Sequence, residues 1–251
     1  MLIFLSLFII STFITQLNAA NFVTPEYVIP CNKSDPDINA CILGSFNHLR
    51  PYLIRGIPDI QVPSIEPMII PRLVMENNAG AVRVKALFVN NTIFGSSNYT
   101  IQSLNADIDT WRINIILSLP RIEVKGKYEV IGQILLFPVR SKGDFWAAFG
   151  DVSAKVELFG KIVKNKENVR FMKIDNLLVD FKLQKSKFKI RDQVNHANVI
   201  GQAMNQFLNQ NANEIIQEMK PAASASISRY FKAFLNSAFL KIPLEVWLHG
   251  A

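Results

Sequence analysis

The chain has 251 residues, of which 49% are hydrophobic, and it carries 27 Lys and Arg against 20 Asp and Glu, for a net charge of +7. This length fits one large or two small domains. The positive charge does not indicate a nucleic-acid partner, because no base-stacking or groove-reading motif accompanies it.

The first 20 residues, MLIFLSLFIISTFITQLNAA, are apolar from Leu2 to Ile14 and end in small residues. This pattern is typical of a secretory signal peptide that is cleaved after Ala19 or Ala20. A membrane anchor is the alternative, but the apolar core is shorter than the ~20 residues that span a bilayer. We therefore expect residues 1–20 to be a signal peptide and the protein to be secreted and extracellular.

The chain contains two cysteines, Cys31 and Cys41. In an extracellular protein such a pair is expected to form a disulfide, and two free thiols are the alternative. A disulfide across so short a loop would stabilise the fold by roughly 3 kcal/mol through the unfolded chain. Three Asn-x-Ser/Thr sequons, at Asn32, Asn90 and Asn98, are candidate glycosylation sites.

Two groups of basic residues follow one another in the second half of the chain. The first comprises Lys161, Lys164, Lys166, Arg170 and Lys173, and the second comprises Lys182, Lys185, Lys187, Lys189 and Arg191. A solvated strand face explains them most simply. Transient contact with anionic membrane surfaces is the alternative.

Two segments precede the region of alternating residues. Ser34 is a candidate N-cap, and helical spacing from Ile38 to Leu49 predicts a short amphipathic helix. The next segment, GIPDIQVPSIEPMIIPRL (residues 56–73), is apolar but interrupted by four prolines. Proline disrupts helix interiors and cannot supply a ladder hydrogen bond, so the segment is neither a core helix nor a central strand.

From Gly80 to Arg191 apolar and polar residues alternate, as in half-buried antiparallel strands. The apolar series is expected to point inward. Its members are Val84, Phe88, Tyr128, Val130, Ile134, Leu136, Val156, Leu158, Val179 and Phe181. After Leu183 the alternation shifts by one, which predicts a β-bulge near Lys185 and Ser186.

The last part of the chain returns to helical spacing. Apolar pairs recur every four residues between Val199 and Ile216, and a stripe with this spacing drifts by roughly 160° around a helix of about 3.6 residues per turn. Such a helix needs apolar contacts around much of its circumference, which predicts a long helix wrapped by a curved sheet. Pro221 is expected to break or kink it. Met204, Phe207 and Leu208 are predicted to face the interior.

Motifs for catalysis are missing from the sequence. It has no Gly-x-Ser-x-Gly, His-Glu-x-x-His or phosphate-binding loop, and its three histidines lie far apart. Asp107 and Asp109 would share one face of a strand, but solvated strand residues explain them better. We expect no catalytic residue, metal or cofactor, and an enzyme is disfavoured.

Several longer segments together resemble the insect takeout and juvenile-hormone-binding protein family over nearly the whole mature chain. They are the early cysteine pair, GIPDIQVPSIEPMIIP, LPRIEVKGKYEVIGQILLFPV, GDFWAAFGDVSAKVELFGK and AMNQFLNQNANEIIQEMKP. A single cysteine pair makes the chain more similar to takeout proteins than to hormone-binding proteins. It departs from the family at Arg140-Ser141, where a glycine is usual, and in VNHANVIGQ, before the long helix.

The resemblance implies an α+β fold for residues 21–251 as a single domain. This fold is an elongated super-roll, with a strongly curved antiparallel sheet around a long C-terminal helix and an apolar tunnel inside. It also implies a monomeric carrier whose partner is a small hydrophobic ligand, such as a juvenile-hormone-like terpenoid, a fatty acid or a related lipid. The alternatives are an enzyme that processes lipid esters and an interaction protein with a packed interior.

Overall fold

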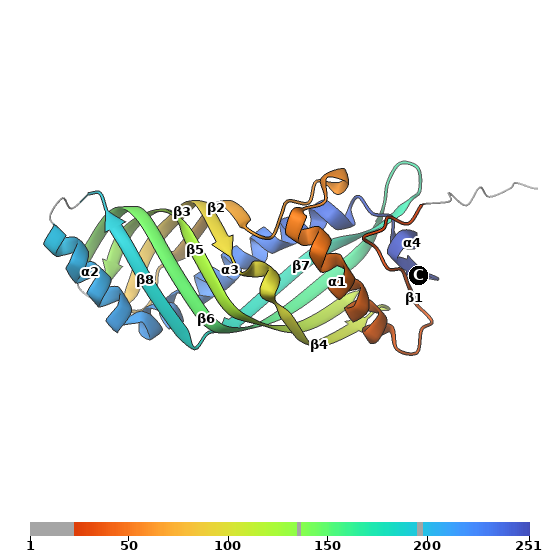
Figure 1. Cartoon of the computed structure of the whole chain (residues 1–251), viewed down its shortest axis with the longest axis horizontal. Coiled ribbons are helices and arrows are strands. Elements are labelled where there is room, and N and C mark those ends of the chain that lie inside the picture. The colour runs from red at the N-terminus through yellow and green to blue at the C-terminus, as the bar shows by residue number, and fades with distance from the viewer. Residues whose placement is uncertain (1–22, 135–136, 195–197) are drawn as a thin grey trace, which may run out of the picture.

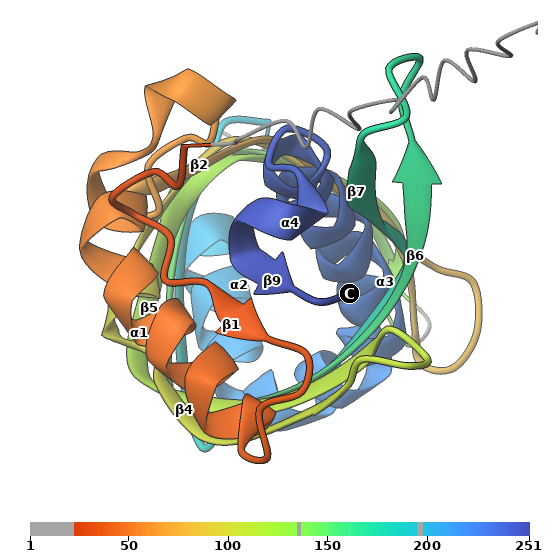
Figure 2. The ribbon, with the colours of Figure 1, turned by 90° about the vertical axis from the view of Figure 1, so that its right-hand side faces the viewer.

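A computed structural model of the protein describes residues 23–134, 137–194 and 198–251. The signal-peptide prediction and Leu136 lie outside these ranges. The chain forms one elongated body in which a curled antiparallel sheet surrounds helices (Figures 1 and 2). The strands are β1 (Cys31–Asn32), β2 (Met68–Asn77), β3 (Val82–Phe94), β4 (Thr100–Asp107), β5 (Arg112–Ile134), β6 (Phe137–Lys164), β7 (Arg170–Lys182), β8 (Lys185–Asp192) and β9 (Leu248–His249). The α-helices are α1 (Ile38–Arg55), α2 (Asn198–Gln210), α3 (Ala212–Phe239) and α4 (Leu244–Trp247), and Pro58–Ile60 and Ser96–Asn98 form 3₁₀ turns.

Helix α1 begins at Ile38 as its spacing predicts, but its N-cap differs from the prediction and it extends past Leu49 to Arg55. Asp37 is its N-cap, with Oδ1 accepting from the Ala40 N–H at 3.2 Å, whereas Ser34 donates to the Asn32 side chain. The prediction of Ser34 as N-cap is therefore wrong. The helix stops at Gly56, whose φ of +83° suits glycine and where a Cβ atom would lie 2.9 Å from the Ser64 nitrogen.

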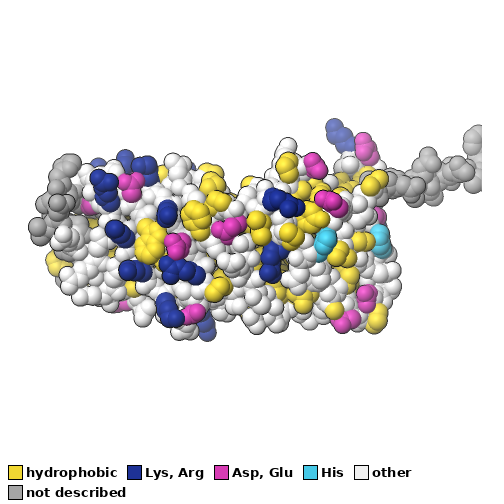
Figure 3. Space-filling view, viewed as in Figure 1, with side chains coloured by type: hydrophobic (Ala, Val, Ile, Leu, Met, Phe, Trp, Pro, Cys, Tyr) yellow, Lys and Arg dark blue, Asp and Glu magenta, His cyan; other side chains and the backbone are white. Residues whose placement is uncertain are grey.

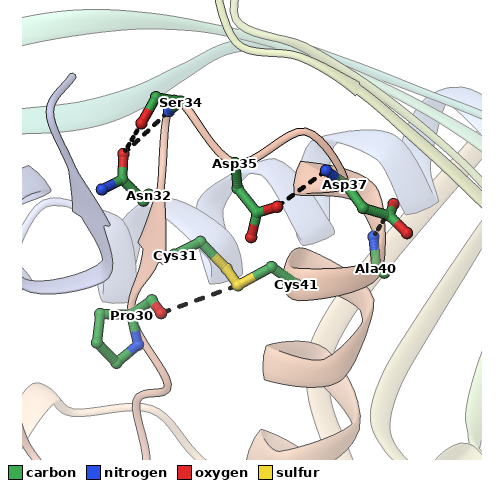
Figure 4. Close-up of a disulfide and its surroundings, with 8 residues drawn as sticks. All are labelled: Pro30, Cys31, Asn32, Ser34, Asp35, Asp37, Ala40 and Cys41. Atoms are coloured by element: carbon green, nitrogen blue, oxygen red, sulfur yellow. Dashed lines mark hydrogen bonds between the residues drawn. A yellow bond between two sulfur atoms is a disulfide. The ribbon is translucent and has the colours of Figure 1, made fainter.

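The predicted disulfide between Cys31 and Cys41 is present, with the two Cα atoms 5.9 Å apart. Figure 4 shows that it links strand β1 to helix α1. Strand β1 also pairs in parallel with β9 near the C-terminus. The disulfide and this short parallel pair thus join the segment around Cys31 to α1 and to the C-terminal residues.

The proline-rich segment forms a turn and then an edge strand. Ile57, Ile60 and Val62 are buried and pack beside α1 and α3. Strand β2 tolerates Pro71 because it lies at the edge of the sheet and pairs only with β3. The expectation of neither a core helix nor a central strand is confirmed, and the apolar residues serve as a packed connection between helices and sheet.

The main sheet has seven strands in the order β2-β3-β5-β6-β7, with β4 also paired to β5 and β8 also paired to β6. The bulge predicted near Lys185 and Ser186 is wrong, because β8 continues the register of β7 along β6: Lys182 lies opposite Ser153 and Lys185 opposite Gly150. The inward alternation changes phase instead beside Asp151 of β6, whose φ is +52°. The sheet therefore bends at its middle without an inserted residue.

The C-terminal helical region is interrupted at Asn211, ten residues before the predicted break. The Asn211 side chain donates to the Phe207 carbonyl oxygen at 2.9 Å, a local bond that competes with helix continuation. Helix α3 runs through Pro221 without ending. The predicted break at Pro221 is therefore wrong as to position, whereas the wrapped helix itself is confirmed by packed clusters on several sides of α3.

Helices α2 and α3 also complete the hydrogen bonding of the sheet edges. Asn236 of α3 accepts from the Ile174 N–H at 2.7 Å and donates to the Ile174 carbonyl at 3.0 Å, as a neighbouring strand would. Asn205 and Asn209 of α2 bond both backbone groups of Ile190 and Phe188 in the same way. On the opposite edge, Ser226 and Tyr230 donate to carbonyls of β2. Helix α3 thus closes the roll between its two edge strands.

We expect Asn236→Ala to lower the free energy of unfolding by about 2 kcal/mol, because it leaves both backbone groups of fully buried Ile174 without their partner. Urea unfolding of the two proteins measures this. Asn209→Ala is the matched control, since its bonds to Phe188 are exposed and water can replace them. Asn209→Ala should lower the free energy of unfolding clearly less than Asn236→Ala does. Equal losses for the two variants would contradict a structural role for the buried contact.

Candidate ligand-binding interior

The inner face of the sheet beside α2 is built by four strands whose paired residues share a face. Phe88 of β3 lies opposite Tyr128 of β5, and Phe145 of β6 lies opposite Ile190 of β8. The rings of Phe88 and Phe145 are 5.1 Å apart in an edge-to-face contact, and those of Tyr128 and Phe145 are 6.4 Å apart. These aromatic contacts hold an apolar wall across three strands.

The predicted lining residues separate into groups along the roll. The group near α2 consists of residues that are buried or half-buried on β3 and β5: Val84, Phe88, Tyr128, Val130 and Ile134. Leu158, Val156 and Val179 lie instead in a packed cluster with Met172 and Ile174, beside Phe231 of α3. Phe181 is half-buried with the Lys220 ammonium 5.9 Å from its ring centre. Met204, Phe207 and Leu208 are half-buried on α2.

Packed apolar clusters involve α1, α3, α4 and the strands around them. Their most buried members include Met172, Ile174, Leu244 and Leu248, which are 0% exposed. None of the lining residues of the group near α2 belongs to these clusters. Val84 and Tyr128 of this group are nevertheless buried, at 6% exposure each. The lining set as a whole stays a prediction.

Two polar residues of the inner face were missed by the sequence analysis. Ser141, which is 1% exposed, lies with its Oγ 2.6 Å from the Tyr128 hydroxyl and 3.0 Å from Asp192 Oδ2. Burial raises the pKa of Tyr128. Asp192 could have been found, because it continues the alternation of Phe188 and Ile190. Ser141 could not be found in this way, because the prediction of inward-facing residues relies on apolar side chains and serine is polar.

Two open hollows lie outside this interior. The larger, of about 430 Å³, follows the line where β7 meets α3 and includes Leu178, Ser228 and Arg229. The smaller, of about 270 Å³, lies beside the start of β8 and the junction of α2 and α3. Both are lined by polar as well as apolar side chains, so neither matches the apolar interior expected for a hydrophobic ligand.

The remaining site predictions concern chemistry and modification. Within the described ranges no three His, Cys, Asp or Glu residues are grouped as a metal site. Asp109 lies in a turn and its N–H donates to Asp107 Oδ1 at 3.0 Å, so the expectation that both lie on one strand is wrong. The sequon residues Asn32, Asn90 and Asn98 are exposed. No helix of the described residues is long and apolar enough to cross a bilayer.

A curled antiparallel sheet closed by a long C-terminal helix is also the architecture of a solved insect protein. Takeout 1 of Epiphyas postvittana superposes with a TM-score of 0.71 at 21% identity, over 88% of this chain and 99% of that chain. The predicted fold class is thereby confirmed.

Sequence comparison places the chain among known proteins. It matches the haemolymph juvenile hormone binding protein family over residues 6–249, and the protein belongs to this family. The circadian clock-controlled protein daywake of Drosophila melanogaster is 22% identical over 228 residues, covering 88% of this chain and 86% of the relative. Daywake of Drosophila yakuba is 22% identical over 223 residues, covering 86% of each. Membership implies a protein that binds a hydrophobic ligand.

Proposed function

We propose that the protein is a secreted carrier that holds a small, neutral hydrophobic molecule inside the roll, next to α2. The ligand class is a terpenoid, a fatty acyl compound or a related lipid. The carrier acts by sequestering this molecule from water, with no bond made or broken. The observation that supports the proposal most is the apolar inner face of β3, β5, β6 and β8 beside α2, with its aromatic contacts among Phe88, Tyr128 and Phe145.

The chemistry of the interior favours neutral ligands. Val84, Phe88 and Val130 offer no partner to an ionised carboxylate, and Asp192 already places one carboxylate on this face of the sheet, 3.0 Å from Ser141 Oγ. Burying a second anion there would be costly. An acidic ligand would have to keep its head group in water, whereas a neutral ligand could be enclosed completely.

Titration with neutral esters of increasing chain length tests the proposal. Each added methylene that fits should contribute about 0.8 kcal/mol, so affinity should rise several-fold per carbon and then level off once the space is full. Mass spectrometry of the ester after incubation separates a carrier from an esterase, since a carrier returns the ester intact. A flat series, or tighter binding of short charged compounds, would contradict recognition by an apolar interior.

Secretion and glycosylation are part of the same proposal. The signal-like N-terminus, the disulfide and the exposed Asn90 and Asn98 suit an extracellular monomer that carries glycans at some of its sequons. Digestion of the secreted protein with a glycosidase, followed by mass measurement, identifies which sequons are occupied.

Contact with anionic membranes is proposed for the outer face of β8. Lys185, Lys187, Lys189 and Arg191 form an exposed row there, and Figure 3 shows Lys and Arg side chains spread over this end of the molecule. Lysines often protect bare strand edges, but α2 already covers the edge of β8 through Asn205 and Asn209. Lys185 of this row also pairs with Asp151 at 2.9 Å, and we propose that the row attracts acidic lipid head groups while a ligand is exchanged.

A further inference from the structure

The hydrogen bonds among Tyr128, Ser141 and Asp192 have a defined direction. An ionised carboxylate only accepts, so the Ser141 hydroxyl donates its single hydrogen to Asp192 Oδ2, 3.0 Å away. Ser141 Oγ then has only lone pairs left for Tyr128, and the 2.6 Å contact between these two oxygens requires Tyr128 to be the donor. The phenolic hydrogen therefore points to Ser141, and the Tyr128 oxygen keeps only acceptor capacity.

We propose that this directed series of hydrogen bonds makes the interior selective for ligands that carry a hydroxyl group over ligands whose only polar atoms are acceptors. This inference rests on the proposed function, because it requires a ligand inside the roll. A ligand alcohol can donate to the Tyr128 oxygen. An ether or ester oxygen would face that oxygen with no hydrogen between them, and burying it unpaired is unfavourable.

The surroundings keep the direction fixed. Ser141 is 1% and Tyr128 6% exposed, so water does not compete for either hydroxyl. Asp192 is anchored by its other oxygen, Oδ1, which accepts from the Val194 N–H at 2.7 Å. These hydrogen bonds depend on Ser141, whose hydroxyl links Tyr128 to Asp192.

Competition between dodecanol and undecyl methyl ether, which have the same number of heavy atoms, tests the inference on the full secreted chain. We expect the wild-type protein to bind the alcohol about tenfold more tightly, the effect of one buried hydrogen bond. Asp192→Asn should reverse the preference. Its amide would donate to Ser141, Ser141 would donate to Tyr128, and the phenolic hydrogen would turn toward the ligand, where the ether can accept it.

Further variants separate this role from a structural one. Ser141→Ala also frees the Tyr128 hydrogen and should raise the relative affinity for the ether, whereas Tyr128→Phe should abolish the preference. Asp144→Asn is the matched control, because Asp144 pairs with Lys127 at 3.0 Å on the outer face, and it should keep the wild-type preference. Equal binding of both compounds by the wild-type protein, or an unchanged preference in Asp192→Asn and Ser141→Ala, would overturn the inference. Binding of neither compound would overturn the proposed function itself.

Discussion

Leu244→Ala is expected to lower the free energy of unfolding by about 2–5 kcal/mol, the range for truncating a fully buried leucine. Leu244 begins α4, is 0% exposed and packs with Cys31, Ile42 and Leu248, next to the disulfide. The truncation leaves a cavity among groups that the disulfide and the β1–β9 pair hold in place. Urea or thermal unfolding of the two proteins measures the loss.

Two controls accompany this prediction. Leu240→Ala, at a leucine that is 41% exposed, should cost less than about 1 kcal/mol. Ligand affinity should stay unchanged in folded Leu244→Ala, because α4 and α2 lie at opposite ends of the molecule (Figure 1). A small effect on stability would mean that α4 docks only loosely, and a loss of affinity would place the ligand nearer to α4 than we propose.

Ala147→Phe is expected to weaken ligand binding roughly 100-fold while changing stability little. Ala147 is buried on the inner face near α2, opposite Val124 and Phe188. A phenyl ring there would occupy space that we assign to the ligand. Displacing about four ligand methylenes, at ~0.8 kcal/mol each, removes about 3 kcal/mol of binding free energy. Titration with the best ester of the neutral series measures the change.

The same substitution distinguishes a ligand space from a packed interior. If the interior near α2 were filled by side chains, the added ring would overpack it and cost roughly 1–3 kcal/mol of stability. Ala233→Phe is the control, since Ala233 is exposed on α3 and should affect neither property. A destabilised Ala147→Phe with unchanged affinity would favour the packed alternative.

Much of the fold could be predicted because the spacing of apolar residues along the sequence directly reflects which faces of strands and helices are buried. The alternation of Val84, Ala86 and Phe88 follows from one buried face, and the drifting stripe of the C-terminal region follows from contacts around the helix. The helix ends were less predictable. Asp37 rather than Ser34 caps α1, and Asn211 rather than Pro221 interrupts the last helices, because local side-chain bonds decide between similar candidates.

The candidate site was predictable only in its apolar part. Alternation indicates which residues face inward, but it does not indicate where the interior is packed, and Leu158 and Val179 lie in a packed cluster with Met172. The position of Ser141 beside Tyr128 and Asp192 depends on the registers of three strands. Those registers are set by long-range pairing, and no short segment of the sequence determines them.

The central claim is that the roll encloses a neutral apolar molecule near α2. The most direct measurement incubates the secreted protein with a total lipid extract, recovers it by gel filtration and analyses the bound material by mass spectrometry. The account predicts that the wild-type protein retains about one equivalent of a neutral lipid or terpenoid and that Ala147→Phe retains almost none. A wild-type protein that retains no apolar molecule, or two proteins that retain the same amount, would contradict it.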